Sequence, residues 1–173
     1  IGSGILGEVA KLFKEQFPNN KAVVVADLNT YRVAGKDIEA CLREAGIEQE
    51  EAYIFTDADL YAEYAYVEKL RNALKLHNAI PIAVGSGTIN DLTKLAAFEA
   101  GRRYMCVATA ASMDGYTAFG SSVTYKGAKQ TFNCPAPQAC LADVEIISKA
   151  PADMTASGYA DLFAKVTAGA DWI

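Results

Sequence analysis

The stretch from Ile80 to Lys94 constrains the fold of this chain more than any other. Residues 80–84 are continuously apolar, as in a strand that is buried on both faces of a sheet. The turn from Gly85 to Gly87 follows, and glycine permits positive φ angles and lets a ligand approach the bare backbone. We expect Thr88 to cap the next helix, with Asp91 three residues later as in a capping box. A helix N-terminus behind a glycine turn suits a phosphate group.

Two interpretations of this turn remain open. A dinucleotide-binding fingerprint has a third glycine at the position that Asn90 holds here, and it usually follows the first strand of its fold. In this chain two strand–helix units precede the turn. The pattern by itself therefore fits either a phosphate site or an ordinary strand-to-helix turn.

Composition limits the class of protein. The chain has 173 residues, enough for one domain and a short extension, and 51% of them are hydrophobic. A net charge of −5 without a basic run argues against nucleic acid as a partner. No apolar stretch has the length of a membrane span, and no signal peptide is visible. Because the first residue is Ile1 rather than Met, we expect a fragment whose beginning has been removed.

The cysteines and the single histidine also restrict the chemistry. Cys41, Cys106, Cys134 and Cys140 form no C-x-x-C pair, which indicates a reducing, cytoplasmic setting. A Cys134–Cys140 disulfide is the less favoured alternative. His77 is expected at a solvated helix end, so a metal site in this chain would need carboxylates.

Strand and helix patterns alternate through the first 108 residues. The expected strands are 22–26, 52–55, 80–84 and 104–108. The expected helices are 4–17, a helix through Ile38 and Ala45 closed by Gly46, 60–77, and a helix that ends at Gly101. This order predicts an α/β fold, a Rossmann-like parallel sheet covered by helices. Ligands bind beyond the carboxyl ends of such strands, where Asp27, residues 56–57, the glycine turn and Thr109 fall.

The pattern changes after Thr109. Residues 110–121 are a loop, and residues 123–125 and 130–132 resemble the strands of an inserted β-hairpin. Residues 140–142 and Val144 to Ile147 are expected to be extended. Pro151 precedes a last helix, Ala152 to Trp172. We therefore expect an α/β domain over residues 1–150, with residues 151–173 as the first helix of a second, all-helical domain.

Three aspartates are candidates for a site, each with a plain structural alternative. Asp114 could accept a hydrogen bond from a substrate hydroxyl, or it could belong to an Asp-Gly turn. Asp161 could ligate a metal or be a surface acid of the last helix. Asp27 could bind ribose hydroxyls, or it could cap the following helix.

Four motifs follow one another in the chain. They are Val-Ala-Asp (25–27), Val-Gly-Ser-Gly-Thr-Ile-Asn-Asp (84–91), Ala-Thr-Ala-Ala-Ser-Met-Asp-Gly-Tyr (108–116) and Ser-Gly-Tyr-Ala-Asp-Leu (157–162). Together they resemble the glycerol-1-phosphate dehydrogenase family. That family belongs to a larger group with the iron-containing alcohol dehydrogenases, glycerol dehydrogenases and dehydroquinate synthases. The resemblance runs along essentially the whole chain.

The resemblance implies an α/β domain that binds NAD(P) and an all-helical domain that supplies most of a divalent metal site. Carried over by position, the cofactor diphosphate would lie on Gly85, Ser86, Gly87, Thr88, Asn90 and Asp91. Thr109 and Ser112 would line the nicotinamide side, and Asp27 would face the adenosine ribose. Asp114 would contact the substrate, and Asp161 would contact both the substrate and the metal.

The implied reaction interconverts dihydroxyacetone phosphate and sn-glycerol 1-phosphate. A zinc, nickel or iron ion would polarise the substrate carbonyl, and the nicotinamide would deliver hydride. The chain departs from the family pattern at two points. Ala118 occupies a position that is commonly serine, and the two metal-ligating histidines of the family lie beyond Ile173. We therefore expect this chain alone to bind dinucleotide weakly, to hold no catalytic metal and not to turn over.

Other functions stay open at this stage. One is a glycerol dehydrogenase or another alcohol dehydrogenase of the same group, and another is a nucleotide-binding module without catalysis. The last helix would leave an apolar face uncovered, so a homo-oligomer is also left open. Neither a membrane nor a nucleic acid is expected as a partner.

Overall fold

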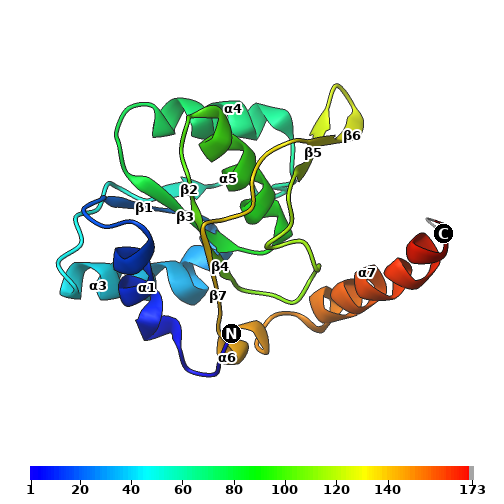
Figure 1. The fold of residues 1–173 in the computed structure, drawn as a ribbon, viewed down its shortest axis with the longest axis horizontal. Helices are drawn as coiled ribbons and strands as arrows, with labels where there is room; N and C mark the ends of the chain where they lie inside the picture. Colours follow the sequence, from blue (N-terminus) through cyan, green and yellow to red (C-terminus); the bar gives the residue numbers. More distant parts are fainter. Residues whose placement is uncertain (172–173) are drawn as a thin grey trace.

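The computed structural model describes residues 1–171 and contains a five-stranded parallel sheet (Figure 1). The strand order is β2-β1-β3-β4-β7, that of a doubly wound fold whose switch point lies between β1 and β3. The strands are β1 (Ala22–Asp27), β2 (Tyr53–Phe55), β3 (Ile80–Gly85), β4 (Met105–Ala108) and β7 (Ala139–Ala142). The predicted α/β fold with a Rossmann-like parallel sheet is confirmed.

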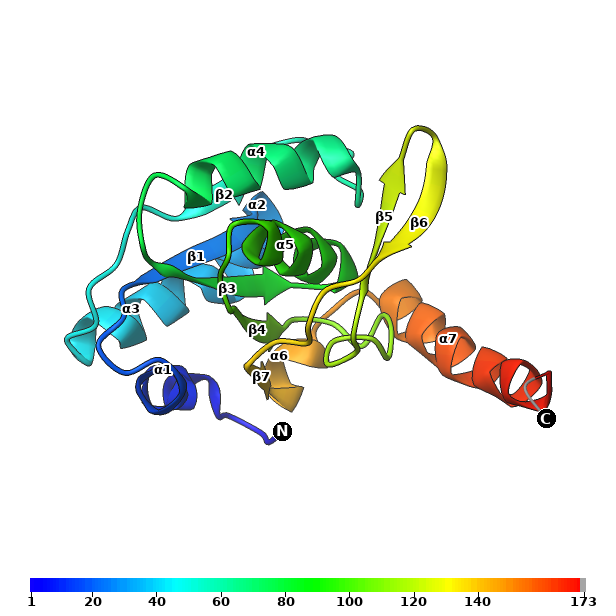
Figure 2. The same cartoon turned by 45° about the horizontal axis from the view of Figure 1, so that its top comes forward.

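Helices cover both faces of this sheet (Figures 1 and 2). One face packs on α1 (Val9–Gln16) and α3 (Lys36–Glu44), and the other on α4 (Tyr64–Leu74) and α5 (Gly87–Glu99). Successive residues of β1 enter the two cores alternately, which explains why the strand is apolar on both faces. The remaining short elements before β2 are η1 (Leu6–Glu8), α2 (Leu28–Thr30) and the π-helical turn η2 (Tyr31–Gly35).

Most predicted boundaries hold within a few residues. The chain leaves α3 through Gly46, whose φ of 71° is the expected left-handed conformation. The helix predicted over residues 60–77 is shorter than expected, because it begins at Tyr64 and ends at Leu74. His77 therefore lies beyond the helix, where its Nδ1 accepts a hydrogen bond from the Ala79 N–H at 3.2 Å.

The predicted hairpin is confirmed as a separate two-stranded sheet. It consists of β5 (Ser121–Tyr125) and β6 (Ala128–Phe132), which pair antiparallel. Lys126 and Gly127 connect them, with φ angles of 53° and 78°. Two consecutive positive φ angles are typical of the type I′ turn that joins strands of matching twist.

The chain after β7 departs from the sequence prediction. Val144 to Ile147 form a short helix, α6, so the predicted extended conformation is wrong. Asp143 caps α6 by accepting a hydrogen bond from the Glu145 N–H at 3.0 Å, and this cap overrides the strand preference of the β-branched residues. None of the helices within residues 1–171 is both long and apolar enough to cross a membrane.

The last helix, α7 (Ala152–Ala170), extends away from the sheet (Figures 1 and 2). None of its residues is buried. Trp172, the predicted end of this helix, lies outside the described residues. The division into residues 1–150 and 151–173 stays a prediction.

All four cysteines are free thiols, so the alternative Cys134–Cys140 disulfide does not form. Cys106 in β4 is instead the neighbour of Cys140 across the ladder to β7.

Candidate functional site

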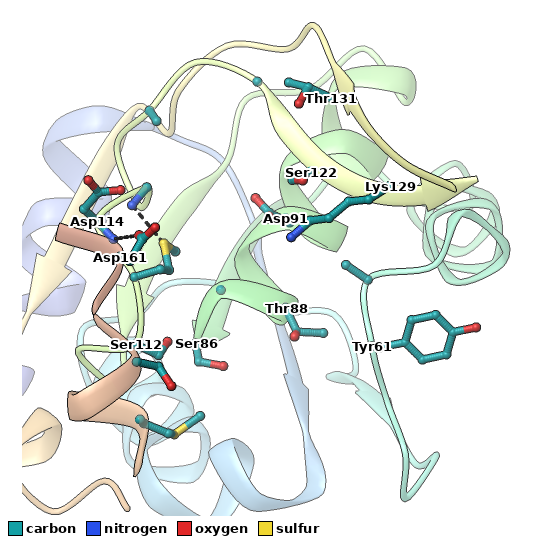
Figure 3. A pocket seen from close by; sticks show the side chains of 18 of the residues that line it. Tyr61, Ser86, Thr88, Asp91, Ser112, Asp114, Ser122, Lys129, Thr131 and Asp161 are labelled. Carbon is teal, nitrogen blue, oxygen red and sulfur yellow. Dashed lines mark hydrogen bonds between the residues drawn. The ribbon is translucent and has the colours of Figure 1, made fainter. Parts of the chain in front are cut away.

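A cavity of about 750 Å³ lies at the carboxyl ends of β3 and β4. Its walls come from the start of α5, the loop before β5, the β5–β6 hairpin and the N-terminal half of α7 (Figure 3). Parallel sheets of this kind bind their ligands at this edge. The predicted site residues that line the cavity are Ser86, Gly87, Thr88, Asp91, Ser112, Asp114 and Asp161.

The glycine turn brings the N-terminus of α5 to the cavity wall. Ser86 is the N-cap residue, with an extended backbone, and α5 begins at Gly87. Thr88 therefore lies inside the first turn, and the predicted Thr88 cap with its Asp91 capping box is wrong. The Ser86 side chain makes no capping hydrogen bond within the described chain, so the first N–H groups of α5 have no side-chain cap.

Close packing, rather than an unusual backbone angle, explains the two glycines of this turn. Neither Gly85 nor Gly87 has a positive φ, so that part of the prediction is wrong. A Cβ atom on Gly85 would lie 2.6 Å from the Cβ of Ile89. A Cβ atom on Gly87 would lie 3.2 Å from Cγ of Met113, a residue of the loop after β4 that also lines the cavity.

Asp114 and Asp161 meet at the opposite wall, although they are far apart in the sequence (Figure 3). The Asp114 N–H donates to Oδ2 of Asp161 at 3.1 Å. Nζ of Lys165 lies 3.4 Å from the Asp114 carboxylate and 3.5 Å from that of Asp161. The Asp114 N–H, together with the charge of Lys165, lowers the pKa of the Asp161 carboxyl. Both carboxylates therefore share one cation, Lys165, at this wall of the cavity.

The loop after β4 and helix α7 approach each other closely enough to require glycine at position 158. A Cβ atom on Gly158 would overlap the carbonyl oxygen of Ala111. Gly158 of the fourth motif therefore lets α7 rest on the loop that carries Ser112 and Asp114.

Among the acids that line the cavity, Asp91 has a clearly raised pKa. Burial raises its pKa to about 6, although Lys94, Lys129 and a backbone hydrogen bond from Ser122 act in the opposite direction. An acid that titrates this close to neutrality within a cavity is typical of a functional site.

Lys129 is a site residue that the sequence reasoning missed. Among the described residues that line the cavity, it is the single cation, and it reaches from the hairpin toward Asp91 (Figure 3). A signal was present in the hairpin, because alternate residues of each strand share a face. The residues of this polar face, which all line the cavity, are Ser122, Thr124, Lys129 and Thr131.

Four predicted cofactor residues do not line the cavity: Asp27, Gly85, Asn90 and Thr109. Oδ1 of Asp27 caps α2 by accepting from Asn29 N at 2.7 Å and Thr30 N at 2.8 Å, which is the structural alternative noted above. Asn90 is 1% exposed, and its Oδ1 accepts a hydrogen bond from the Tyr104 hydroxyl at 3.0 Å. Thr109 is buried, and its N–H donates to the Gly85 carbonyl.

The described residues do not complete a metal site. Within residues 1–171 no group of three or more histidine, cysteine, aspartate or glutamate side chains could hold a metal ion. His77 does not line the cavity. Asp161 remains a predicted ligand.

Comparison with known proteins gives a consistent result. A family model described as iron-containing alcohol dehydrogenase matches residues 1–151. A protein of Bacillus subtilis (strain 168) named glycerol-1-phosphate dehydrogenase, NAD(P)+, is 36% identical over 157 residues, which are 89% of this chain and 40% of that protein. A protein with the same name from Pyrococcus furiosus is 33% identical over 174 residues, 99% of this chain and 48% of that protein. The chain thus spans less than half the length of these relatives.

Solved structures support the fold. The glycerol dehydrogenase of Schizosaccharomyces pombe superposes with a TM-score of 0.78 at 22% identity, over 95% of this chain and 41% of that one. The NADH-dependent butanol dehydrogenase A of Thermotoga maritima superposes with a TM-score of 0.83 at 15% identity, over 96% and 48%.

Proposed function

The chain belongs to the iron-containing alcohol dehydrogenase family, and we propose that it is the NAD(P)-binding part of a glycerol-1-phosphate dehydrogenase. One observation carries the proposal: the N-terminus of α5, without a side-chain cap, opens behind a glycine turn into a cavity at the carboxyl edge of a parallel sheet. The names of the relatives support the choice of cofactor and of substrate.

The cavity fits a dinucleotide. Its volume of about 750 Å³ is in the range of cofactor sites. Ser86, Gly87 and Thr88 line the cavity, and the first N–H groups of α5 have no side-chain cap, so they are available to a diphosphate. Lys129 is the cation on the facing wall, and four acids line the rest of the cavity, namely Asp91, Asp114, Asp153 and Asp161.

The residues take distinct roles in this proposal. The first turn of α5 binds the diphosphate, and Ser112 and Thr109 lie toward the nicotinamide. Asp27 has one carboxylate oxygen outside its cap bonds, and that oxygen would meet the adenosine ribose. Asp114 accepts a hydrogen bond from a substrate hydroxyl. When bound, NAD(P)H supplies the hydride that reduces dihydroxyacetone phosphate to sn-glycerol 1-phosphate.

Fewer observations support a metal site than support the cofactor site. Asp161 is the proposed first ligand, and the Asp114 N–H and Lys165 lower the pKa of its carboxyl group, which keeps it charged. Since the described residues offer no set of three ligands, we assign no chemical step to the metal and do not choose between zinc, nickel and iron. We also propose a cytoplasmic setting, which the four free thiols favour.

Calorimetric titration of the 173-residue chain with NADH and NADPH tests this function. Gly87→Arg places a long cationic side chain between α5 and Met113 and should abolish binding. Gly7→Arg is the matched control, because a Cβ atom there meets nothing within 4 Å and Gly7 does not line the cavity. Equal binding by both variants, or no binding by the unaltered chain at millimolar cofactor, would contradict the proposal.

Two further measurements separate the neighbouring functions. We expect no oxidation of NADH with dihydroxyacetone phosphate by the 173-residue chain, with or without added divalent metal, because the chain offers one proposed ligand. Metal-dependent turnover would overturn that expectation. Turnover with dihydroxyacetone but not with its phosphate would favour the glycerol dehydrogenase alternative. Any turnover would exclude the binding-module alternative, whereas binding without turnover fits both that alternative and the proposed function.

A further inference from the structure

Lys94 is a buried cation in the second turn of α5. Its side chain is 1% exposed, and it is among the largest fully buried side chains of the chain. Nζ donates to the carbonyl oxygens of Ala118 at 2.9 Å and Gly120 at 3.0 Å. These carbonyls belong to the loop that leads into β5. An ammonium group buried this far from water is costly unless its donors are used, and here two carbonyls of a distant loop accept from two of the three donors.

The same turn of α5 binds this loop at two more points. The Ser121 hydroxyl donates to the Asp91 carbonyl at 2.8 Å. The backbone of Ser122 donates to the Asp91 carboxylate. Four hydrogen bonds therefore join two residues of α5, Asp91 and Lys94, to the segment from Ala118 to Ser122.

This segment is a wall of the cavity. Ala118, Gly120 and Ser122 all line it, and β5 continues from here into the hairpin that carries Lys129. Gly120 has a φ of 86°, a conformation that glycine adopts readily and other residues rarely do. The ammonium group of Lys94 accordingly fixes where the wall and the hairpin stand relative to the first turn of α5.

We propose that Lys94 is a positioning residue for the cofactor cavity, and that it holds the 118–122 segment in place before a dinucleotide arrives. The inference rests on the proposed function as far as the ligand is concerned. The proposal gives a role to a residue outside the cavity, since Lys94 does not line it. A wall that is already in place reduces the ordering that binding would otherwise require.

Lys94→Met tests the proposal, because methionine keeps much of the length of the side chain and removes the ammonium group. Arg102→Met is the matched control. Arg102 also donates to two backbone carbonyls, those of Ala79 and His77, but it lies outside the cavity. Each variant is titrated with NADH well below its unfolding midpoint, so that a loss of stability alone leaves the Kd unchanged.

We expect Lys94→Met to weaken NADH binding by about tenfold or more, roughly the effect of one lost hydrogen bond to a charged group. Arg102→Met should lower the unfolding midpoint and keep the Kd within about twofold, the scale of a surface substitution. Equal Kd values for Lys94→Met and the unaltered chain, or an equal loss in both variants, would overturn the proposal.

A measurement without cofactor separates this inference from the proposed function. Amide hydrogen exchange of the unliganded chain should be faster at residues 118–122 in Lys94→Met and unchanged there in Arg102→Met. If the chain binds no NADH but the exchange result holds, the proposed function fails and the positioning role stands. If Lys94→Met does not fold, Ser121→Ala removes the neighbouring hydrogen bond to Asp91 and should produce the same local change to a smaller extent. Unchanged exchange would refute the role.

Discussion

Asp91→Asn should make the protein more stable at neutral pH. Burial in the cavity wall raises the pKa of Asp91 from 3.8 to about 6, because the surroundings disfavour the charged carboxylate. Lys94 and Lys129 favour the charged form, and burial outweighs them. Asparagine is neutral and nearly the same shape, and its Oδ1 still accepts the hydrogen bond from the Ser122 backbone. The variant therefore lacks the cost of the buried charge and keeps the fold of the loop.

The size of the effect follows from the pKa. One pKa unit corresponds to about 1.4 kcal/mol, so a rise from 3.8 to about 6 corresponds to at most about 3 kcal/mol. Solvent in the cavity reaches part of this carboxylate and screens it, so we expect about 1–3 kcal/mol. The sign is that of an acid with a raised pKa. Its cost is absent below the unfolded value near 3.8, develops as the pH rises to about 6, and is constant above that.

The assay is urea unfolding followed by circular dichroism between pH 4 and pH 7.5. The free energy of unfolding of the unaltered chain is subtracted from that of Asp91→Asn at each pH, which cancels the other titrating groups. The difference should be small near pH 4 and should grow to about 1–3 kcal/mol above pH 6 in favour of the variant. A difference that stays constant with pH, or one that turns in favour of the unaltered chain as the pH rises, would refute the reasoning.

Two further substitutions test other parts of the fold. Asp143→Asn should cost at least about 2 kcal/mol, because Asp143 accepts backbone hydrogen bonds from Gly4 at 3.0 Å and Leu6 at 2.9 Å through different oxygens. These bonds lower the pKa of Asp143, so its contribution to stability is present above pH 3.8 and is lost as the pH falls through the pKa of the folded state, opposite to Asp91. A difference in stability between Asp143→Asn and the unaltered chain that does not shrink in acid would contradict this. Gly85→Ala should cost about 1–3 kcal/mol in the same urea assay, since its Cβ would lie 2.6 Å from Ile89, whereas unchanged stability would show that this contact relaxes freely.

The sequence predicted the features that depend on local periodicity and on turn chemistry. Continuous apolar runs identified β1, β3 and β4, and the alternation of strands and helices identified the parallel sheet. Lys126–Gly127 between two short runs that resemble strands, 123–125 and 130–132, identified the hairpin. Each strand or turn signal lies within about ten residues of chain, where spacing determines conformation, and the sheet follows from the order of these signals.

Features that depend on contacts between distant segments were missed or mistaken. Val144 to Ile147 looks extended, but Asp143 caps it as a helix and also binds the backbone of Gly4 and Leu6, about 140 residues earlier. The glycine turn was correctly placed but for the wrong reason. Gly85 and Gly87 have ordinary φ angles and are small because Ile89 and Met113 lie against them.

The predicted site residues show the same difference between local signals and contacts of distant segments. Ser112 and Asp114 lie in the cavity because they follow a strand, and a strand end could be read from the sequence. Asn90 belongs to a motif that suggests ligand contact, yet its side chain is buried and bonded to Tyr104. Adjacent residues of a helix point in different directions, so Asp91 lines the cavity while Asn90 bonds to Tyr104.

Helix α5 shows why its motif contains so many polar residues. The helix is buried along most of its length, and a helix buried on all sides is normally apolar throughout. Asn90, Thr93 and Lys94 are nevertheless buried polar residues of this helix. Asn90 bonds to Tyr104 just before β4, and Lys94 bonds to the loop before β5. The hydrogen bonds of Asn90 and Lys94 fix the relative position of the elements that they join, because a displacement would break them inside the protein. Asn90 and Lys94 therefore join α5 to the segments that follow it in the chain, and the Lys94 bonds hold the cavity wall beside the uncapped N-terminus of the helix.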